Sequence, residues 1–187
     1  MKKFKLTSEF IVDISGVKLF RIKALIEFGN VKAGDLGGYI EKEENLSHMG
    51  DAWVSDDARI SGNAQVFGNA QVFGDAQVFG DAWVFGNAWV FGNARVSGNA
   101  RVSGDAQVFG DARVSGDKDY AYAHGFGSCN RTTTFFRLKD GDVGVRCGCF
   151  YGTLAQFRDK VCETHGETKK AQEYLMLADL MEIRFKN

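Results

Sequence analysis

Apolar and polar positions alternate along residues 51–116 with a strict six-residue period. Aliphatic residues recur at Val54, Ile60, Val66, Val72, Val78, Val84, Val90, Val96, Val102, Val108 and Val114. An alanine stands two positions before each of them, and a Gly-Asn or Gly-Asp pair begins two positions after all but Val54. A period of six equals two cycles of the two-residue alternation of a strand plus a corner, and it does not match the 3.6-residue period of a helix.

Each repeat therefore predicts a short strand followed by a tight corner. In residues 70–73, Ala70 and Val72 share one face of the strand, while Gln71 and Phe73 share the other. Gly74 and Asp75 then form the corner, because glycine and aspartate tolerate the positive φ of a tight turn. Identical corners between four-residue strands predict a polygonal coil that stacks on itself.

The repeat resembles the motif of the hexapeptide-repeat superfamily, an aliphatic residue followed four positions later by a small one. This resemblance implies a left-handed parallel β-helix with three hexads per turn, in the homotrimer usual for that fold. It says little about function, because the superfamily contains acyltransferases as well as pure scaffolds. The flanking residues 29–38, 43–47, 147–150 and 163–166 are similar to β-helical proteins of enterobacterial phages and prophages.

The rest of the chain predicts two smaller parts. Residues 1–28 alternate as short strands and are interpreted as an N-terminal β cap, which leaves residues 29–117 for the β-helix. Residues 118–187 predict a C-terminal α+β domain. Its strands are expected over 132–138 and 143–150, followed by a helix that begins at Thr153 and a second helix capped by Thr168. The predicted fold class is an all-β left-handed parallel β-helix with these two additions.

Composition narrows the range of partners. The chain has 187 residues and a formal net charge of -1, so no global field attracts nucleic acid or an anionic membrane. No stretch approaches the roughly 18 apolar residues of a membrane span, and no apolar segment follows Lys2 and Lys3 at the N-terminus. We therefore expect a soluble, cytoplasmic protein.

With three hexads per turn, the outward residues fall on three faces. The first face carries Trp53, Ser55, Gln71, Phe73, Trp89, Phe91, Gln107 and Phe109. The second face carries Arg59, Ser61, Gln77, Phe79, Arg95, Ser97, Arg113 and Ser115. The third face carries Gln65, Phe67, Trp83, Phe85, Arg101 and Ser103. The first face therefore predicts a ladder of aromatic rings that points away from the core.

An exposed aromatic ladder is seldom left in water, and two explanations stay open. The ladder is buried between subunits or against the C-terminal domain, or it lines a ligand cleft between subunits. In such a cleft, aromatic rings would face arginines of a neighbouring subunit, an arrangement that suits a base and its phosphates. The predicted ligand-binding residues are Trp89, Phe91, Phe109, Arg95, Arg101 and Arg113.

The candidate bases for catalysis are few. An acyltransferase of this fold needs a histidine at the subunit cleft, but His48, His124 and His165 all lie outside the regular coils. We predict no catalytic residue, no cofactor and no enzyme. The alternatives are an acyltransferase that uses acetyl-CoA and a structural assembly protein.

Three cysteines and one histidine of the predicted C-terminal domain are of residue types that bind metals. Cys147 and Cys149 are expected on one face of a strand, and Cys162 and His165 on one face of a helix. They could bind zinc if the strand and helix packed face to face, although buried cysteines usually serve as small apolar residues. No metal site is predicted.

Together these observations predict a non-enzymatic, trimeric binding protein of phage type. Its ligand would be a host signalling nucleotide or a host protein, which it would sequester to counter host defence. Neither a membrane nor a nucleic-acid polymer is expected as a partner.

Overall fold

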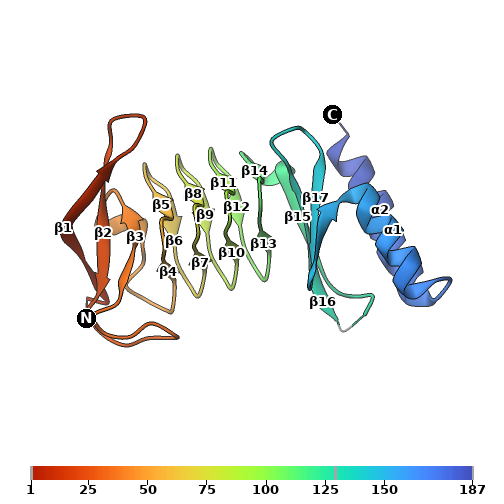
Figure 1. Cartoon of the computed structure of the whole chain (residues 1–187), viewed down its shortest axis with the longest axis horizontal. Coiled ribbons are helices and arrows are strands. Elements are labelled where there is room, and N and C mark those ends of the chain that lie inside the picture. The colour runs from red at the N-terminus through yellow and green to blue at the C-terminus, as the bar shows by residue number, and fades with distance from the viewer. Residues whose placement is uncertain (1, 129, 187) are drawn as a thin grey trace.

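A computed structural model describes residues 2–128 and 130–186 of the chain. The molecule is elongated, and three parts follow one another along its long axis (Figure 1). Antiparallel strands lie at the N-terminal end, a stack of coils forms the middle, and a small sheet covered by two helices lies at the C-terminal end. The N-terminal strands are β1 (Phe4–Val12), β2 (Lys18–Ala24) and β3 (Leu36–Ile40), followed by the short 3-10 helix η1 (Glu43–Asn45).

The coils are built from two-residue strands, one for each hexad. They are β4 (Trp53–Val54), β5 (Arg59–Ile60), β6 (Gln65–Val66), β7 (Gln71–Val72), β8 (Gln77–Val78), β9 (Trp83–Val84), β10 (Trp89–Val90), β11 (Arg95–Val96), β12 (Arg101–Val102), β13 (Gln107–Val108) and β14 (Arg113–Val114). Trp89 pairs in parallel with Gln71 and Gln107, each 18 positions away. This register confirms the predicted three hexads per turn and the predicted assignment of outward residues to faces.

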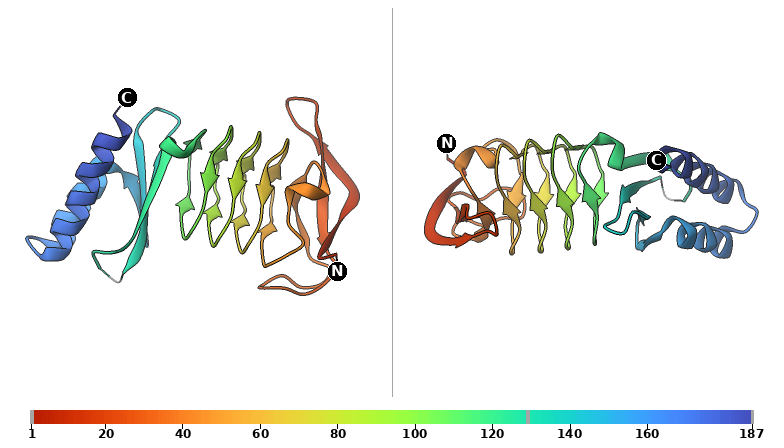
Figure 2. Two further views of the ribbon diagram at one scale, coloured as in Figure 1. Left: turned by 180° about the vertical axis from the view of Figure 1, so that it is seen from behind. Right: turned by 90° about the horizontal axis from the view of Figure 1, so that it is seen from above.

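Three parallel sheets therefore form a prism (Figure 2). The first face consists of β4, β7, β10 and β13, the second contains β5, β8, β11 and β14, and the third consists of β6, β9 and β12. The inward alanines of the hexads are fully buried, and the inward aliphatic residues are at most 1 % exposed. The core is thus a continuous column of small and β-branched side chains, as the period of six predicts.

The corners stack as closely as the core. Gly86 has a φ of 71°, and a Cβ atom there would lie 2.9 Å from the amide nitrogen of Gly104 in the next turn. Glycine is therefore required both for the turn and for the close approach of successive turns. The Asn69 side chain donates a hydrogen bond to Asn87 (3.1 Å), and Asn87 donates to Asp105 (3.0 Å). These ladders give the Asn or Asp after several corner glycines a role in joining successive turns.

The N-terminal strands extend the solenoid instead of forming a separate unit. β3 pairs antiparallel with β2 and parallel with β5, so the second-face sheet continues through β3 and β2 to β1. The predicted boundary after residue 28 therefore falls within one sheet. The expectation that Trp53 belongs to an exposed ladder is wrong. Its side chain points outward but is only 4 % exposed, because the rings of Phe28 and Phe4 lie 5.3 Å and 6.5 Å from it.

The C-terminal part comprises a four-stranded antiparallel sheet and two helices. Its elements are the 3-10 helix η2 (Asp117–Asp119), the strands β15 (Tyr120–Phe126), β16 (Arg131–Arg137), β17 (Val143–Cys147) and β18 (Phe150–Thr153), and the helices α1 (Leu154–His165) and α2 (Lys169–Phe185). Thr168 is the N-cap of α2, as predicted, and Thr153, where the sequence predicts the start of the first helix, is the N-cap of α1. The single strand predicted over 143–150 is wrong. Gly148 adopts a φ of 57°, so the chain turns there and β17 pairs with β18.

This sheet lies between the coils and the helices (Figure 2). Neighbouring residues on β16 point to its opposite faces. Phe136 joins the core of the solenoid, whereas Phe135 packs with Phe157, Tyr174 and other residues of the helices. No helix within residues 2–128 and 130–186 is long and apolar enough to span a bilayer.

Candidate functional site

The six predicted ligand-binding residues lie on all three faces of the prism. Trp89, Phe91 and Phe109 belong to the first face, Arg95 and Arg113 to the second, and Arg101 to the third. Within one chain the arginines therefore do not face the first-face rings. A site that combines the two kinds of residue requires a second subunit, as the sequence prediction assumed.

The first-face rings form a stack along the long axis. Phe73 and Phe91 lie 4.8 Å apart with an interplanar angle of 12°, and Phe91 lies 4.5 Å from Phe109. Trp89 meets Phe73 edge to face at 5.9 Å and is 44 % exposed. The stacking stabilises each ring beyond the area that it buries. The ladder is thus a rigid surface from which the Trp89 indole protrudes.

The C-terminal sheet covers one end of this ladder. Tyr151 of β18 meets Phe109 edge to face at 4.8 Å, and the Arg146 guanidinium lies 5.6 Å from the centre of the Phe109 ring. Phe109 is therefore partly occupied by contacts within its own chain. The part that stays open to a ligand consists of Phe73, Trp89 and Phe91.

A groove of about 430 Å³ runs beside these open rings. Its apolar side is formed by Phe73, Trp89 and Val31. The remaining lining is polar and uncharged apart from one carboxylate, and comprises Gly29, Asn30, Asp51, Asn69, Gln71 and Asn87. Amide side chains of this kind both donate and accept hydrogen bonds, which suits the edge of a base.

The three predicted arginines differ in their surroundings. Arg95 is exposed on the second face. Arg113 donates from Nη1 to the carbonyl oxygens of Asn93 (3.1 Å) and Ala112 (2.8 Å), so its guanidinium is held against the backbone. Arg101 stacks over the Trp83 indole, with 5.0 Å between its Cζ atom and the ring centre. Of these three arginines, Arg95 is thus the one for which the described residues provide no such contact.

A second aromatic cluster lies on the third face, where Arg101 was the one predicted ligand-binding residue. Phe67 and Phe85 stack at 5.0 Å with an interplanar angle of 3°, and Trp83 meets Phe67 edge to face at 6.0 Å. Beside them lies a groove of about 720 Å³, here called the third-face groove. It is lined by Lys2, Glu43, Glu44, Leu46, Ser47, His48, Gln65, Val66, Phe67 and Trp83. The aromatic side of this groove was visible in the repeat. Its other side, here called the cap side, comes from Lys2 and from residues 43–48, which precede the regular coils.

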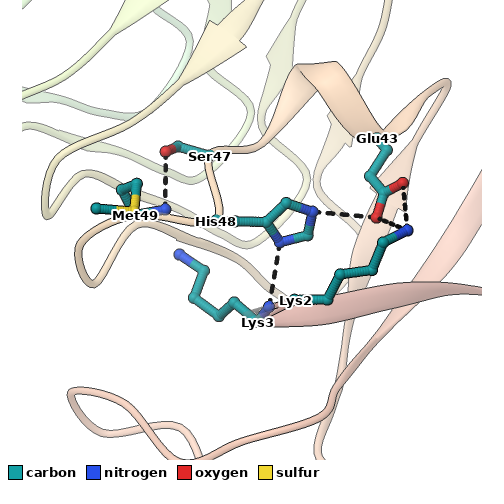
Figure 3. Close-up of polar contacts among 6 residues, drawn as sticks. All are labelled: Lys2, Lys3, Glu43, Ser47, His48 and Met49. Atoms are coloured by element: carbon teal, nitrogen blue, oxygen red, sulfur yellow. Dashed lines mark hydrogen bonds and ion pairs between the residues drawn. The ribbon is translucent and has the colours of Figure 1, made fainter.

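A hydrogen-bonded network forms the cap side of this groove (Figure 3). The Glu43 carboxylate accepts from Lys2 Nζ at 2.8–2.9 Å, and it lies 3.0 Å from His48 Nε2. The Lys3 amide donates to His48 Nδ1 at 3.1 Å. Nδ1 is therefore an acceptor, and Nε2 carries the proton that is donated to Glu43. The hydrogen bond from Lys2, and then that from His48, holds the pKa of Glu43 below its usual value.

Both nitrogens of His48 are thus occupied, and its ring stacks on Phe4 at 4.4 Å. This histidine joins the cap to the first coil and has no free lone pair to act as a base. His124 is exposed on β15, where its Nδ1 lies 2.9 Å from Thr132 Oγ1. The His165 ring lies 5.8 Å from that of Tyr174.

Cys147, Cys149 and Cys162 belong to no group of metal-ligand side chains among the residues that the structure describes. The expectation that Cys147 and Cys149 share a strand face is wrong, because β17 ends at Cys147 and Cys149 lies in the turn that follows. Thr133 donates a hydrogen bond to the Cys147 thiol (3.2 Å), while Cys149 and Cys162 are exposed. Across the described part of the chain, no three His, Cys, Asp or Glu side chains are grouped so that they could hold a metal ion.

Comparison with known proteins agrees with this architecture. A family model described as the YdcK beta solenoid repeat matches residues 58–74, 88–104 and 94–107, all within the regular coils. The search of curated proteins gave no match. The matched repeats and the three parallel sheets together show that the chain is a repeat β-solenoid protein.

Proposed function

We propose that this protein is a non-enzymatic binding protein that acts as a homotrimer and sequesters a nucleotide in clefts between its subunits. The observation that carries the proposal is the open part of the first-face ladder, where Trp89 is 44 % exposed beside the stacked Phe73 and Phe91 rings. A contiguous aromatic surface of this kind is rarely left in water. It is therefore expected to be covered by a ligand, a subunit, or both.

The chemistry of the first face suits a nucleobase. A base packs flat on or between aromatic side chains, and the amides of Gln71 and Asn87 in the adjacent groove can meet its polar edge. A nucleotide also carries phosphates, and guanidinium groups recognise these with paired hydrogen bonds. Arg95 lies on the second face, so it would reach the phosphates only from a neighbouring subunit. The proposed site is thus complete only in the oligomer.

The residue types of the coils support a binding role and not a catalytic one. Residues 53–115 contain no histidine, cysteine, lysine or glutamate, so the prism offers no conventional general base apart from corner aspartates. His48, the histidine nearest to the first coils in the sequence, has both ring nitrogens engaged. The similarity of the flanking segments to phage and prophage proteins supports a role in the host cytoplasm, where removal of a signalling nucleotide would counter host defence.

Calorimetric titration of the purified protein with mononucleotides and cyclic dinucleotides tests the proposal. We expect one nucleotide to bind per chain, and we expect Trp89→Ala and Arg95→Ala each to weaken binding at least about tenfold, a loss of about 1.4 kcal/mol. Trp83→Ala is the matched control, because Trp83 is an exposed indole at the same hexad position on the third face, which takes no part in the proposed nucleotide site.

Several results would contradict the proposal. Absence of nucleotide binding, or binding that both variants leave unchanged, would remove the ligand assignment. Tight binding of acetyl-CoA with acyl transfer to an acceptor would favour an acyltransferase instead. Light scattering should show a closed trimer, whereas open polymers would favour a structural assembly protein.

A further inference from the structure

We infer that the third-face groove is a second binding site and that its ligand is an uncharged saccharide. This inference is independent of the proposed nucleotide site, because the groove lies on another face and a single chain supplies all of its lining. Its volume of about 720 Å³ falls within the range of roughly 300–1,000 Å³ typical of small-molecule sites. The floor, the rim and the charge of the groove each support a saccharide ligand.

The floor of the groove is apolar and rigid. Trp83 is 37 % exposed, and its ring is fixed by edge-to-face contact with Phe67. Arg101, from the following turn, stacks on the indole, while the groove is formed by the preceding turns and the cap. The indole is therefore held on one side by Arg101 and is open toward the groove. A pyranose ring presents C–H groups on one face, which pack against such an aromatic surface through dispersion and loss of water.

The rim of the groove offers both donors and acceptors. Glu43 is held in place by Lys2 and His48, and the lone pairs that remain on its carboxylate can accept further hydrogen bonds. The Ser47 hydroxyl oxygen accepts from the Met49 amide at 3.0 Å, which leaves its O–H group free to donate (Figure 3). Gln65 adds an exposed amide beside Trp83. Sugar hydroxyls donate and accept at once, so they fit a rim of mixed character.

The charges around the groove are balanced and argue against a charged ligand. The carboxylates of Glu43 and Glu44 lie on the cap side with the Lys2 ammonium, and Arg101 lies behind Trp83. A phosphate would meet two carboxylates, which would repel it. An organic cation would meet Lys2 at the rim and a guanidinium already stacked on the indole. A ligand that is uncharged, apolar on one face and rich in hydroxyl groups fits the balanced charge, the apolar floor and the mixed rim of the groove.

Titration of the full-length protein with defined sugars tests the inference. The probes are glucose, N-acetylglucosamine, maltose, cellobiose and chitobiose. The binding of each is measured by calorimetry and by saturation-transfer NMR. At least one should bind with a Kd of about 1 mM or lower, the range expected for a small polar ligand in an open groove. Trp83→Ala should weaken that binding at least about tenfold, because it removes the floor, and Gln65→Ala should weaken it several-fold.

Trp89→Ala is the matched control, because Trp89 occupies the same position of the next hexad on the first face. It should leave sugar affinity unchanged while weakening the proposed nucleotide site, so the two proposals fail separately. Failure of every sugar to bind would overturn the inference, as would equal losses in Trp83→Ala and Trp89→Ala. Adenosine that displaces the sugar from this groove and binds more tightly would also overturn it, in favour of a nucleoside.

Discussion

The two ends of the solenoid close the same column of coils with opposite chemistry. At the N-terminal end, side-chain donors meet backbone carbonyl groups. The Lys3 side chain is almost fully buried, and its ammonium donates to the carbonyl oxygens of Ala52 (2.7 Å) and Gly50 (3.2 Å). Its charge also lies 4.7 Å from the centre of the Phe28 ring. Near this end, the Asn45 side chain donates in the same way to backbone carbonyls of the following turn.

At the C-terminal end, side-chain acceptors meet backbone amides. The Asp119 carboxylate accepts from the Ser115 amide at 2.9 Å and from its hydroxyl at 2.6 Å. The Thr134 hydroxyl accepts from the Gln107 amide, and Asp117 accepts from the Arg101 amide, both at 2.9 Å. These residues come from η2 and β16, outside the regular coils.

The comparison shows where single side chains control this fold. Within the coils, the backbone groups of each turn are satisfied by its neighbours, so the ladder is shared among many equivalent residues. The terminal turns lack a neighbour on one side, and an unsatisfied buried backbone group is costly. The ends are therefore closed by individual residues, and substitutions there test the comparison directly.

The largest loss of stability is expected when the buried phenylalanine ring at either end of the solenoid core is removed. Phe4 and Phe136 are fully buried at opposite ends of the same core. Phe4→Ala and Phe136→Ala should each lower the free energy of unfolding by about 3–5 kcal/mol, through lost burial and the cavity left behind. Denaturant unfolding followed by circular dichroism measures both changes. A loss below about 1 kcal/mol at one end would show that this end contributes little to the stability of the coils.

Removal of the capping side chains should lower stability less than removal of the buried rings. The loss should be similar at the two ends. Lys3→Met keeps the apolar stem but leaves the carbonyls of Gly50 and Ala52 without their donor, and Asp119→Ala leaves the Ser115 amide without its acceptor. We expect each to cost about 1–3 kcal/mol, the penalty for an unsatisfied buried group. Lys5→Met, at an exposed position of β1, is the control and should change stability little. Equal stability of Lys3→Met and the native protein would contradict the capping role.

The buried ammonium should also make stability depend on pH. Burial lowers the pKa of Lys3 to about 8, against a weaker opposing effect of Asp51. A lysine in an unfolded chain titrates near pH 10.4. Between about pH 8 and pH 10, the unfolded chain therefore binds more protons at this site, and the contribution of Lys3 to the free energy of unfolding rises with pH. Below about pH 8 both states hold the proton, so the cost of burying the charge is present in full.

The difference between the native protein and Lys3→Met isolates this contribution, because it cancels the other titrating groups. The comparison should stop near pH 10, because burial raises the pKa of Tyr120 and both proteins therefore lose stability above that pH. Above about pH 10 the unfolded chain loses a tyrosine proton that the folded chain keeps, which lowers stability. A difference that does not change between pH 8 and pH 10 would show that Lys3 keeps its normal pKa.

The smallest effect concerns the faces between the two ends. Phe91→Ala should cost about 1–2 kcal/mol, because it removes stacking with both Phe73 and Phe109 along with partly buried area. Phe79→Ala should change the free energy of unfolding by less than about 0.5 kcal/mol, because Ser61 and Ser97 flank this exposed ring in the adjacent turns. Equal effects would show that stacking does not stabilise the first-face ladder.

The six-residue period by itself determined the coils, their register and the sorting of outward residues. Each of these depends on local alternation and on a corner that only glycine and its Asn or Asp neighbour make easily. The helix starts at Thr153 and Thr168 were equally local, because an N-cap acts on the first turn after it. The coils can be predicted because each repeat packs on near-identical repeats in the adjacent turns.

Tertiary structure alone decided which outward residues stay open. Trp53 and Phe109 occupy the same face as Trp89, yet Phe28 covers the first and Tyr151 covers the second. The third-face groove likewise needs Lys2 and Glu43 beside Trp83, residues far apart in the sequence. Contacts of this kind depend on how the two ends fold back onto the prism, and no periodic pattern records them. The repeat specifies a surface, and the non-repeating ends decide which part of it stays exposed.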